Sequence, residues 1–172
     1  MKNLKFGAYT DSTNDFGPVI TKQHQQSVIN HISSAEKQGA NIVVDGRNAI
    51  VSGYENGFYV GGTLIDKVTP QMDSYKAEIF GPVLQIVRVA TMKDAMSLID
   101  NHEYGNGTCI FTRDGEAARY FSDHIKVGMV GVNIPLPVPV AYHSFGGWKR
   151  SLFGDLHAYG PVSYTHLRAH ET

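Results

Sequence analysis

Cysteine is nearly absent from this 172-residue sequence, which contains a single one, Cys109. One thiol cannot form an intramolecular disulfide, and it cannot supply the group of thiolates that a cysteine-based zinc site needs. Long apolar runs are missing too, so no segment reaches the ~20 apolar residues of a membrane-spanning helix. The start, residues 1–7, lacks the apolar stretch of a secretory signal peptide. We therefore expect a protein of the reducing cytoplasm with no membrane partner.

An excess of charge of either sign is also absent. The 15 Lys and Arg residues nearly balance the 16 Asp and Glu residues, which gives a formal net charge of −1. Nucleic-acid-binding domains show a basic patch or stripe, and none stands out here, so we expect no nucleic-acid partner. Hydrophobic residues make up 42% of the chain and charged residues 18%, which is typical of a folded globular domain and not of a disordered one.

The second half of the chain alternates between strand and helix patterns. Residues 83–89, 108–112 and 128–133 are apolar, partly β-branched runs that predict strands. Thr91 opens a capping box ahead of one helical segment, and Asp114 is placed to cap a second. This order of elements predicts an α/β fold with a mostly parallel sheet and covering helices.

The first half contains one clear helix. Residues 23–38 carry Val28, Ile32 and Ala35 at helical spacing, and Gly39 stands where a helix commonly ends. Residues 42–44 predict a strand, and the short extended pieces 57–60 and 63–65 follow.

The final segment, residues 162–172, has little apolar patterning and resembles the translation of a sequencing adapter. We therefore expect residues 1–161 to be the native part and the natural reading frame to end near residue 160 or 161.

A series of motifs resembles the aldehyde dehydrogenase family. Residues 78–82 read Glu-Ile-Phe-Gly-Pro, a carboxylate, an aromatic ring and a Gly-Pro turn directly before a predicted strand. Four further segments resemble family motifs in the same order, namely residues 16–19, 57–65, 104–112 and 144–151. The resemblance implies that the chain is the C-terminal part of the family's catalytic domain, with the nucleophilic cysteine upstream of residue 1.

The resemblance also implies a cofactor site at the first motif. In the family, the glutamate at the position of Glu78 holds the ribose hydroxyls beside the nicotinamide of NAD, and the aromatic ring at Phe80 packs near the nicotinamide. A carboxylate is suited to that task because it can accept hydrogen bonds from both hydroxyls of a ribose.

A second motif narrows the resemblance to one branch of the family. Asn133 is followed by prolines at 135, 137 and 139, a pattern similar to the CoA-acylating methylmalonate-semialdehyde branch. The resemblance implies that Asn133, Pro135 and Phe145 line the aldehyde pocket. Because proline fixes its own φ and lacks an N–H, we expect this loop to be stiff and extended. Ser144 replaces the proline of the general family motif.

For the intact protein, the branch resemblance implies an NAD-dependent dehydrogenase. It would oxidise malonate or methylmalonate semialdehyde and transfer the acyl group to coenzyme A, in valine or inositol breakdown. A homo-oligomer, a tetramer, is also implied. Since the nucleophile is expected upstream, we predict that the 172-residue chain alone is inactive.

Other interpretations stay open at this point. The intact enzyme could be a hydrolytic aldehyde dehydrogenase, or the chain could be a non-catalytic binding module. Cys109 lies in an apolar run and is therefore interpreted as a small, unreactive core residue and not as a nucleophile. His166 and His170 have the spacing of helical metal ligands but no third ligand nearby, so no metal site is predicted.

Overall fold

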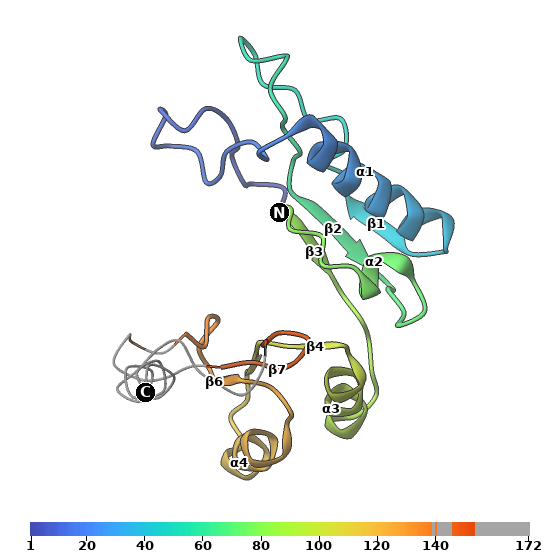
Figure 1. Ribbon diagram of the computed structural model, residues 1–172, viewed down its shortest axis with the longest axis vertical. Helices are drawn as coiled ribbons and strands as arrows, with labels where there is room; N and C mark the ends of the chain where they lie inside the picture. The colour runs from blue at the N-terminus through green and yellow to red at the C-terminus, as the bar shows by residue number, and fades with distance from the viewer. Residues whose placement is uncertain (139, 141–145, 154–172) are drawn as a thin grey trace, which may run out of the picture. The chain divides into compact units, whose positions relative to one another are not determined.

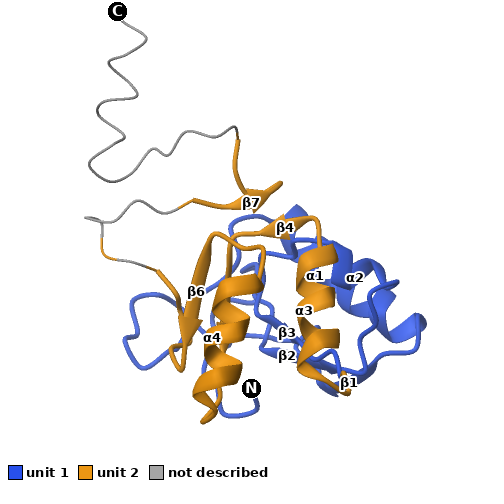
Figure 2. Cartoon of the chain, turned by 90° about the horizontal axis from the view of Figure 1, so that it is seen from below, with its two compact units in different colours: residues 1–88 blue, residues 89–172 orange. Residues whose placement is uncertain are grey.

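The computed structural model describes residues 1–138, 140 and 146–153. Its contacts divide the chain into two compact units, unit 1 with residues 1–88 and unit 2 with residues 89–172 (Figures 1 and 2). Each unit has a hydrophobic core of its own. The predicted site residues fall in both units.

Unit 1, all of which is described, has two helices and three strands. They are α1 (Lys22–Lys37), β1 (Asn41–Val44), β2 (Thr63–Asp66), α2 (Asp73–Lys76) and β3 (Val83–Gln85). Helix α1 begins where the Thr21 hydroxyl accepts the His24 amide N–H at 3.1 Å. It ends before Gly39, whose φ of 98° favours a residue without a Cβ. The predicted helix over residues 23–38 is confirmed to within one residue at each end.

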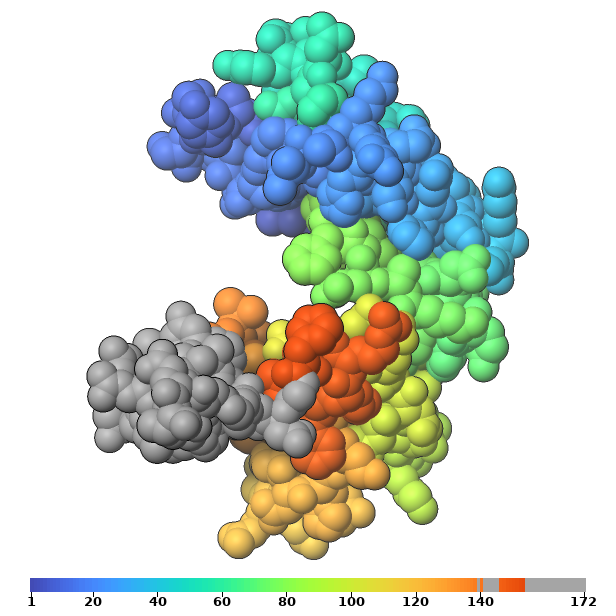
Figure 3. Space-filling view, in the orientation of Figure 1, coloured from blue at the N-terminus to red at the C-terminus, as the bar shows by residue number. Residues whose placement is uncertain are grey.

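The three strands of unit 1 form one sheet in the order β1-β2-β3. Strands β1 and β2 are antiparallel, with an irregularity between Ile42 and Val44, whereas β2 and β3 are parallel. The long connection from β1 to β2 stands out from the rest of unit 1 (Figures 1 and 3). The parallel pair matters for the site, because it fixes the start of β3 beside Thr63 of β2.

The core of unit 1 is built on one face of α1. Val28, Ile32 and Ala35 are fully buried at the predicted helical spacing, and they cluster with Ile65 of β2. Burying a Val or Ile side chain is worth roughly 1.5–3 kcal/mol, so this face holds the helix on the sheet.

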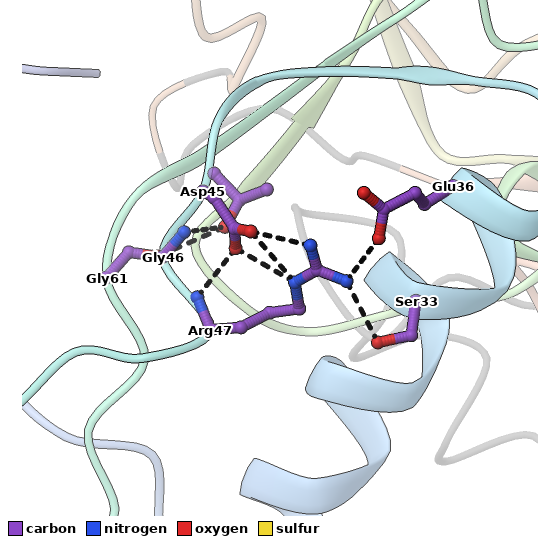
Figure 4. Close-up of polar contacts among 7 residues, drawn as sticks. Ser33, Glu36, Asp45, Gly46, Arg47 and Gly61 are labelled. Carbon is purple, nitrogen blue, oxygen red and sulfur yellow. Dashed lines mark hydrogen bonds and ion pairs between the residues drawn. The ribbon is translucent and has the colours of Figure 1, made fainter.

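Arg47, just after β1, links the β1–β2 connection to α1 through an ion pair with Glu36 (Figure 4). Its guanidinium donates to Asp45 through Nε and Nη2, and its Nη1 donates to Glu36 at 2.7 Å and to Ser33 at 3.2 Å. Next to it, Gly46 has no room for a side chain, because a Cβ there would lie 1.9 Å from the carbonyl oxygen of Gly61. The two glycine backbones are thus in direct contact.

In the described part of unit 2, helices and strands alternate. They are α3 (Met92–Asn101), β4 (Tyr104–Gly105), β5 (Gly107–Ile110), α4 (Gly115–His124), β6 (Met129–Val132) and β7 (Trp148–Lys149). Thr91 and Asp94 form the predicted capping box at the start of α3, and the Asp114 carboxylate accepts the amides that open α4. Strands β5 and β6 are parallel with α4 between them in sequence, which confirms the predicted strand–helix–strand unit.

The core of unit 2 joins Met96 of α3 and Phe121 of α4 to Ile125 and Val127, which lead into β6. A second pair, β4 with β7, is antiparallel and brings Gly105 opposite Trp148. Of the strand pairs in the described residues, two are parallel and two antiparallel, and the predicted α/β class is confirmed. The predicted strand over residues 83–89 is shorter, ending at Gln85.

Two further observations concern membranes and the tail. Among the described residues, no helix has the length and hydrophobicity needed to cross a lipid bilayer. The predicted non-native tail, residues 162–172, lies outside the described residues.

Candidate functional site

The Glu-Ile-Phe-Gly-Pro segment connects α2 to β3 in unit 1. Its residues alternate in exposure: Glu78 and Phe80 are exposed, with Phe80 at 76%, while Ile79 packs against the core of unit 1. The segment therefore exposes a carboxylate and an aromatic ring to solvent, two residues apart. Ile79, between them, anchors the segment to the core of unit 1.

The backbone at Phe80 has an uncommon conformation. Its φ is 49°, in the left-handed region, which costs a non-glycine residue about 1–3 kcal/mol and persists only when the surroundings enforce it. Three contacts do so. The His24 ring nitrogen Nε2 lies 2.8 Å from the Phe80 carbonyl oxygen, a Cβ on Gly81 would lie 2.8 Å from Cγ2 of Val28, and the Thr63 amide donates to the Pro82 carbonyl at 2.8 Å.

Thr63 links this turn to the Arg47 contacts. Its side chain is fully buried, and its Oγ1 accepts the amide N–H of Gly46 at 3.0 Å. The Gly61 amide donates to the Gly46 carbonyl at 2.9 Å, which fixes the chain just before β2. Arg47, the residue after Gly46, joins this part of the chain to α1 through its bonds to Ser33 and Glu36.

The second group of predicted site residues lies in unit 2, at the end of β6. Asn133 has a φ of 58°, and its backbone amide donates to the Ile110 carbonyl at 2.8 Å. Its side-chain Oδ1 accepts the Thr112 amide and its Nδ2 donates to the Thr112 carbonyl, both at 3.0 Å. The Asn133 side chain thus extends the β5–β6 pairing beyond the strands. Pro135 follows and is exposed.

Phe145, the third predicted pocket residue, lies outside the described residues, as does Pro139. The remainder of the Gly-Gly-x-Lys-x-Ser motif is described. Lys149 directs its Nζ to three carbonyl oxygens at the C-terminal end of α3, those of Ile99 at 2.9 Å, Asp100 at 3.1 Å and His102 at 3.0 Å. Sequence reasoning missed this role, because the motif lysine and the helix end are about fifty residues apart.

Ser151 completes that motif by accepting the Gly105 amide N–H with its Oγ at 3.0 Å. Gly128 lies against the Gly146 carbonyl oxygen, where a Cβ would come within 1.9 Å. The motif is therefore joined to the β4 region by close backbone contacts that glycine alone allows.

Cys109, the sole thiol, is half-buried in β5 and is not part of the core cluster of unit 2, so its interpretation as a core residue is wrong. An ideal Cβ on Gly131 of the neighbouring strand would lie 3.1 Å from its sulfur, so the thiol fills the space opposite a glycine. His166 and His170 lie outside the described residues, and the described part of the chain contains no group of three or more potential metal ligands.

The exposed pair in unit 1 suits one half of a nicotinamide dinucleotide. A carboxylate such as Glu78 can accept two hydrogen bonds from vicinal ribose hydroxyls, and an aromatic ring such as Phe80 offers an apolar face to a flat heterocycle. Both side chains are exposed and their backbone is fixed, so a ligand could reach them without rearrangement of the core.

Comparison with known proteins identifies the family. Residues 1–169 match the model of the aldehyde dehydrogenase family, and the chain belongs to that family. It is 66% identical over 161 residues to the malonate-semialdehyde dehydrogenase of Pseudomonas aeruginosa, a match that covers 94% of this chain and 32% of the relative.

Solved structures agree with this assignment. The methylmalonate-semialdehyde dehydrogenase of Oceanimonas doudoroffii is 78% identical, with a TM-score of 0.92, over 94% of this chain and 33% of that one. The betaine aldehyde dehydrogenase of Staphylococcus aureus in complex with NAD+ is 26% identical, with a TM-score of 0.87, over 96% of this chain and 32% of that one. This chain spans about a third of the length of the relatives it matches.

Proposed function

We propose that this chain contributes to an NAD-dependent dehydrogenase that oxidises malonate or methylmalonate semialdehyde and transfers the acyl group to coenzyme A, in valine or inositol breakdown. Three findings support the proposal. They are the family membership, the substrate class in the names of the Pseudomonas and Oceanimonas relatives, and the resemblance of the Asn133 loop to the CoA-acylating branch.

The observation that carries the proposal is the exposed Glu78–Phe80 pair on a turn whose backbone lies against His24, Val28 and Thr63. In the proposed complex, the Glu78 carboxylate accepts hydrogen bonds from the two ribose hydroxyls next to the nicotinamide, and Phe80 packs near the ring. Bound NAD supplies the hydride acceptor, and the protein supplies its orientation. Asn133, Pro135 and Phe145 are proposed to border the aldehyde pocket, with Asn133 acting through the loop shape that its side chain sets.

The proposed chemistry proceeds through a covalent intermediate on the enzyme. A cysteine thiolate expected in the rest of the enzyme attacks the aldehyde carbon, and the hydride of that carbon would pass to bound NAD, which leaves a thioester on the cysteine. The carboxylate of the thioester leaves as carbon dioxide, and the adjacent carbon takes up a proton from solvent. The thiol of coenzyme A then loses its proton, attacks the thioester carbon and displaces the enzyme thiolate, which releases acetyl-CoA or propionyl-CoA. Dividing the oxidation from the acyl transfer lets each step proceed over a lower barrier.

The test is NADH formation by the full-length gene product with malonate semialdehyde, with and without coenzyme A. We expect NADH formation and acetyl-CoA as the product, and a large rise in the KM for NAD in Glu78→Gln. NADH formation with free acid as the product would favour the hydrolytic alternative. NAD binding without turnover would favour the binding module, and the 172-residue chain alone is expected to form no NADH.

Two further properties belong to the proposal. We propose a homotetramer for the whole enzyme, which light scattering of the purified protein tests, and a cytoplasmic location, which cell fractionation tests.

A further inference from the structure

We propose that His24 is a positioning residue for the nicotinamide half of the dinucleotide, acting through the carbonyl of Phe80. This inference rests on the proposed function, because it assigns His24 to the turn that presents Glu78 and Phe80. The juxtaposition is long-range: His24 and Phe80 are 56 residues apart in sequence, and Nε2 lies 2.8 Å from the carbonyl oxygen.

The position of His24 is itself fixed. It stands in the first turn of α1, where its own amide N–H donates to the hydroxyl of the N-cap residue Thr21 at 3.1 Å. One helical turn further on, Val28 is fully buried and packs on Gly81. Residues four apart lie on the same face of a helix, so one face of α1 holds both Phe80 and Gly81.

The chemistry of the contact sets the state of the ring. A carbonyl oxygen only accepts hydrogen bonds, so Nε2 of His24 must carry a hydrogen, either as the neutral Nε2–H tautomer or as imidazolium. A side chain without a donor at that point leaves the carbonyl of a left-handed residue unsupported. Because φ values near +49° are unfavourable for phenylalanine, the turn then relaxes and shifts both Phe80 and the neighbouring Glu78.

The consequence for the enzyme is specific to the dinucleotide. A turn that samples several conformations presents the carboxylate and the ring correctly for only part of the time, which weakens cofactor binding in proportion. The aldehyde-binding and acyl-transfer steps make no use of this turn in the proposed function. We therefore expect the loss to appear in the KM for NAD and not in the KM for coenzyme A.

Two variants of the full-length gene product test the proposal. His24→Leu removes the donor and keeps a side chain of similar size, and its KM for NAD should rise about tenfold, while kcat changes less than about threefold. His24→Gln keeps an N–H donor, and its KM should return to within about threefold of the unmodified enzyme. The control is Gln26→Leu, because Gln26 lies on the same helix and its amide donates only to the exposed Asn30, at 2.9 Å. It should leave the KM for NAD unchanged.

A second measurement does not depend on activity. Nitrogen chemical shifts of the His24 ring, recorded on the 172-residue chain, should show a hydrogen on Nε2. A neutral ring with its hydrogen on Nδ1 would overturn the proposal, and so would an unchanged KM for NAD in a folded His24→Leu enzyme. If the unmodified enzyme forms no NADH, the proposed function fails, whereas a slowly exchanging Nε2–H signal would still show that His24 donates to the turn. The same signal decides the matter if leucine prevents folding.

Discussion

The side chain of Asn133 both accepts a hydrogen bond from the main chain of Thr112 and donates one back to it, each at 3.0 Å. A primary amide has the same donor and acceptor as a peptide group, so Asn133 continues the parallel β5–β6 pairing after the backbone of β6 has turned away. The backbone of Asn133, with a φ of 58°, turns the chain into the proline-rich loop. Asparagine tolerates this left-handed conformation better than most residues, so it can supply both the side-chain hydrogen bonds and the turn.

Replacing Asn133 separates these two roles. Asn133→Ala removes both hydrogen bonds and places an unfavourable residue in the left-handed region, so unit 2 should lose about 2–3 kcal/mol of unfolding free energy. Asn133→Gly removes the bonds but adopts the conformation freely, so the loss should be about 1 kcal/mol smaller. Urea unfolding followed by the fluorescence of Trp148, the single tryptophan, measures both. Equal losses for the two variants would show that the conformation contributes nothing.

Lys149 offers a test in the same unit. Because its ammonium donates to three carbonyl groups at the C-terminal end of α3, Lys149→Met should destabilise unit 2 by about 1–2 kcal/mol. Methionine has a similar length and bears the same cost of the left-handed backbone at this position, where φ is 58°, so the change isolates the ammonium. The matched control is Lys93→Met at the start of α3, where a positive charge is unfavourable to the helix dipole. That variant should be unchanged or slightly more stable, and equal losses in both would contradict the capping role.

Local signals in the sequence predicted the helix boundaries well. The capping box at Thr91, the aspartate cap at Asp114 and the glycine at 39 each act within four residues of the boundary they set, so the sequence contains the whole interaction. The family motifs likewise identified Glu78 and Phe80 as a pair, and the structure places both on one exposed turn.

What the sequence could not predict depends on long-range contacts or on very short elements. Helix α2 has four residues and β4 and β7 have two each, too few for a periodic pattern. The contacts that shape the site join His24 to Phe80, Asn133 to Thr112 and Lys149 to the end of α3. No local pattern specifies such pairs, because each forms only after the elements between its members have packed.

The Arg47 contacts predict a dependence of stability on pH. The hydrogen bonds from Arg47 lower the pKa of Asp45 below its ordinary value of 3.8. A carboxyl group whose pKa is depressed on folding stabilises the folded chain above its unfolded pKa, and this stability is lost as the pH falls through the folded pKa. The unfolding free energy of unit 1 should therefore decrease as the pH is lowered below about 4. At that pH Asp45 takes up a proton and its ion pair with Arg47 is lost.

Arg47→Met tests this dependence directly. It should lower the stability of unit 1 by about 1–3 kcal/mol at neutral pH, because two carboxylates lose their partner, and it should flatten the fall below pH 4. Hydrogen exchange at the Gly61 amide, which donates to Gly46, reports on the affected loop. Arg88→Met is the comparison, because Arg88 also lowers the pKa of its partner Asp66. The Arg88 side chain is 68% exposed, so its loss should have the smaller effect. Equal effects of the two substitutions would contradict the importance of the Arg47 contacts.

Gly81 and Val28 provide the sharpest test of packing beneath the proposed cofactor turn. An alanine Cβ at Gly81 would lie 2.8 Å from Cγ2 and 3.0 Å from Cγ1 of Val28, which is fully buried. Since a core side chain cannot move aside freely, Gly81→Ala should cost about 1–3 kcal/mol in unit 1. Val28→Ala removes both methyl groups that meet the new atom, so the double variant should cost less than the two single losses added together. Thermal unfolding of the four proteins measures that coupling.

Gly115→Ala is the control, because nothing lies within 4 Å of a Cβ at that helical position and alanine favours a helix. Additive losses in the double variant would mean that the cost of Gly81→Ala comes from the backbone conformation and not from contact with Val28 of α1.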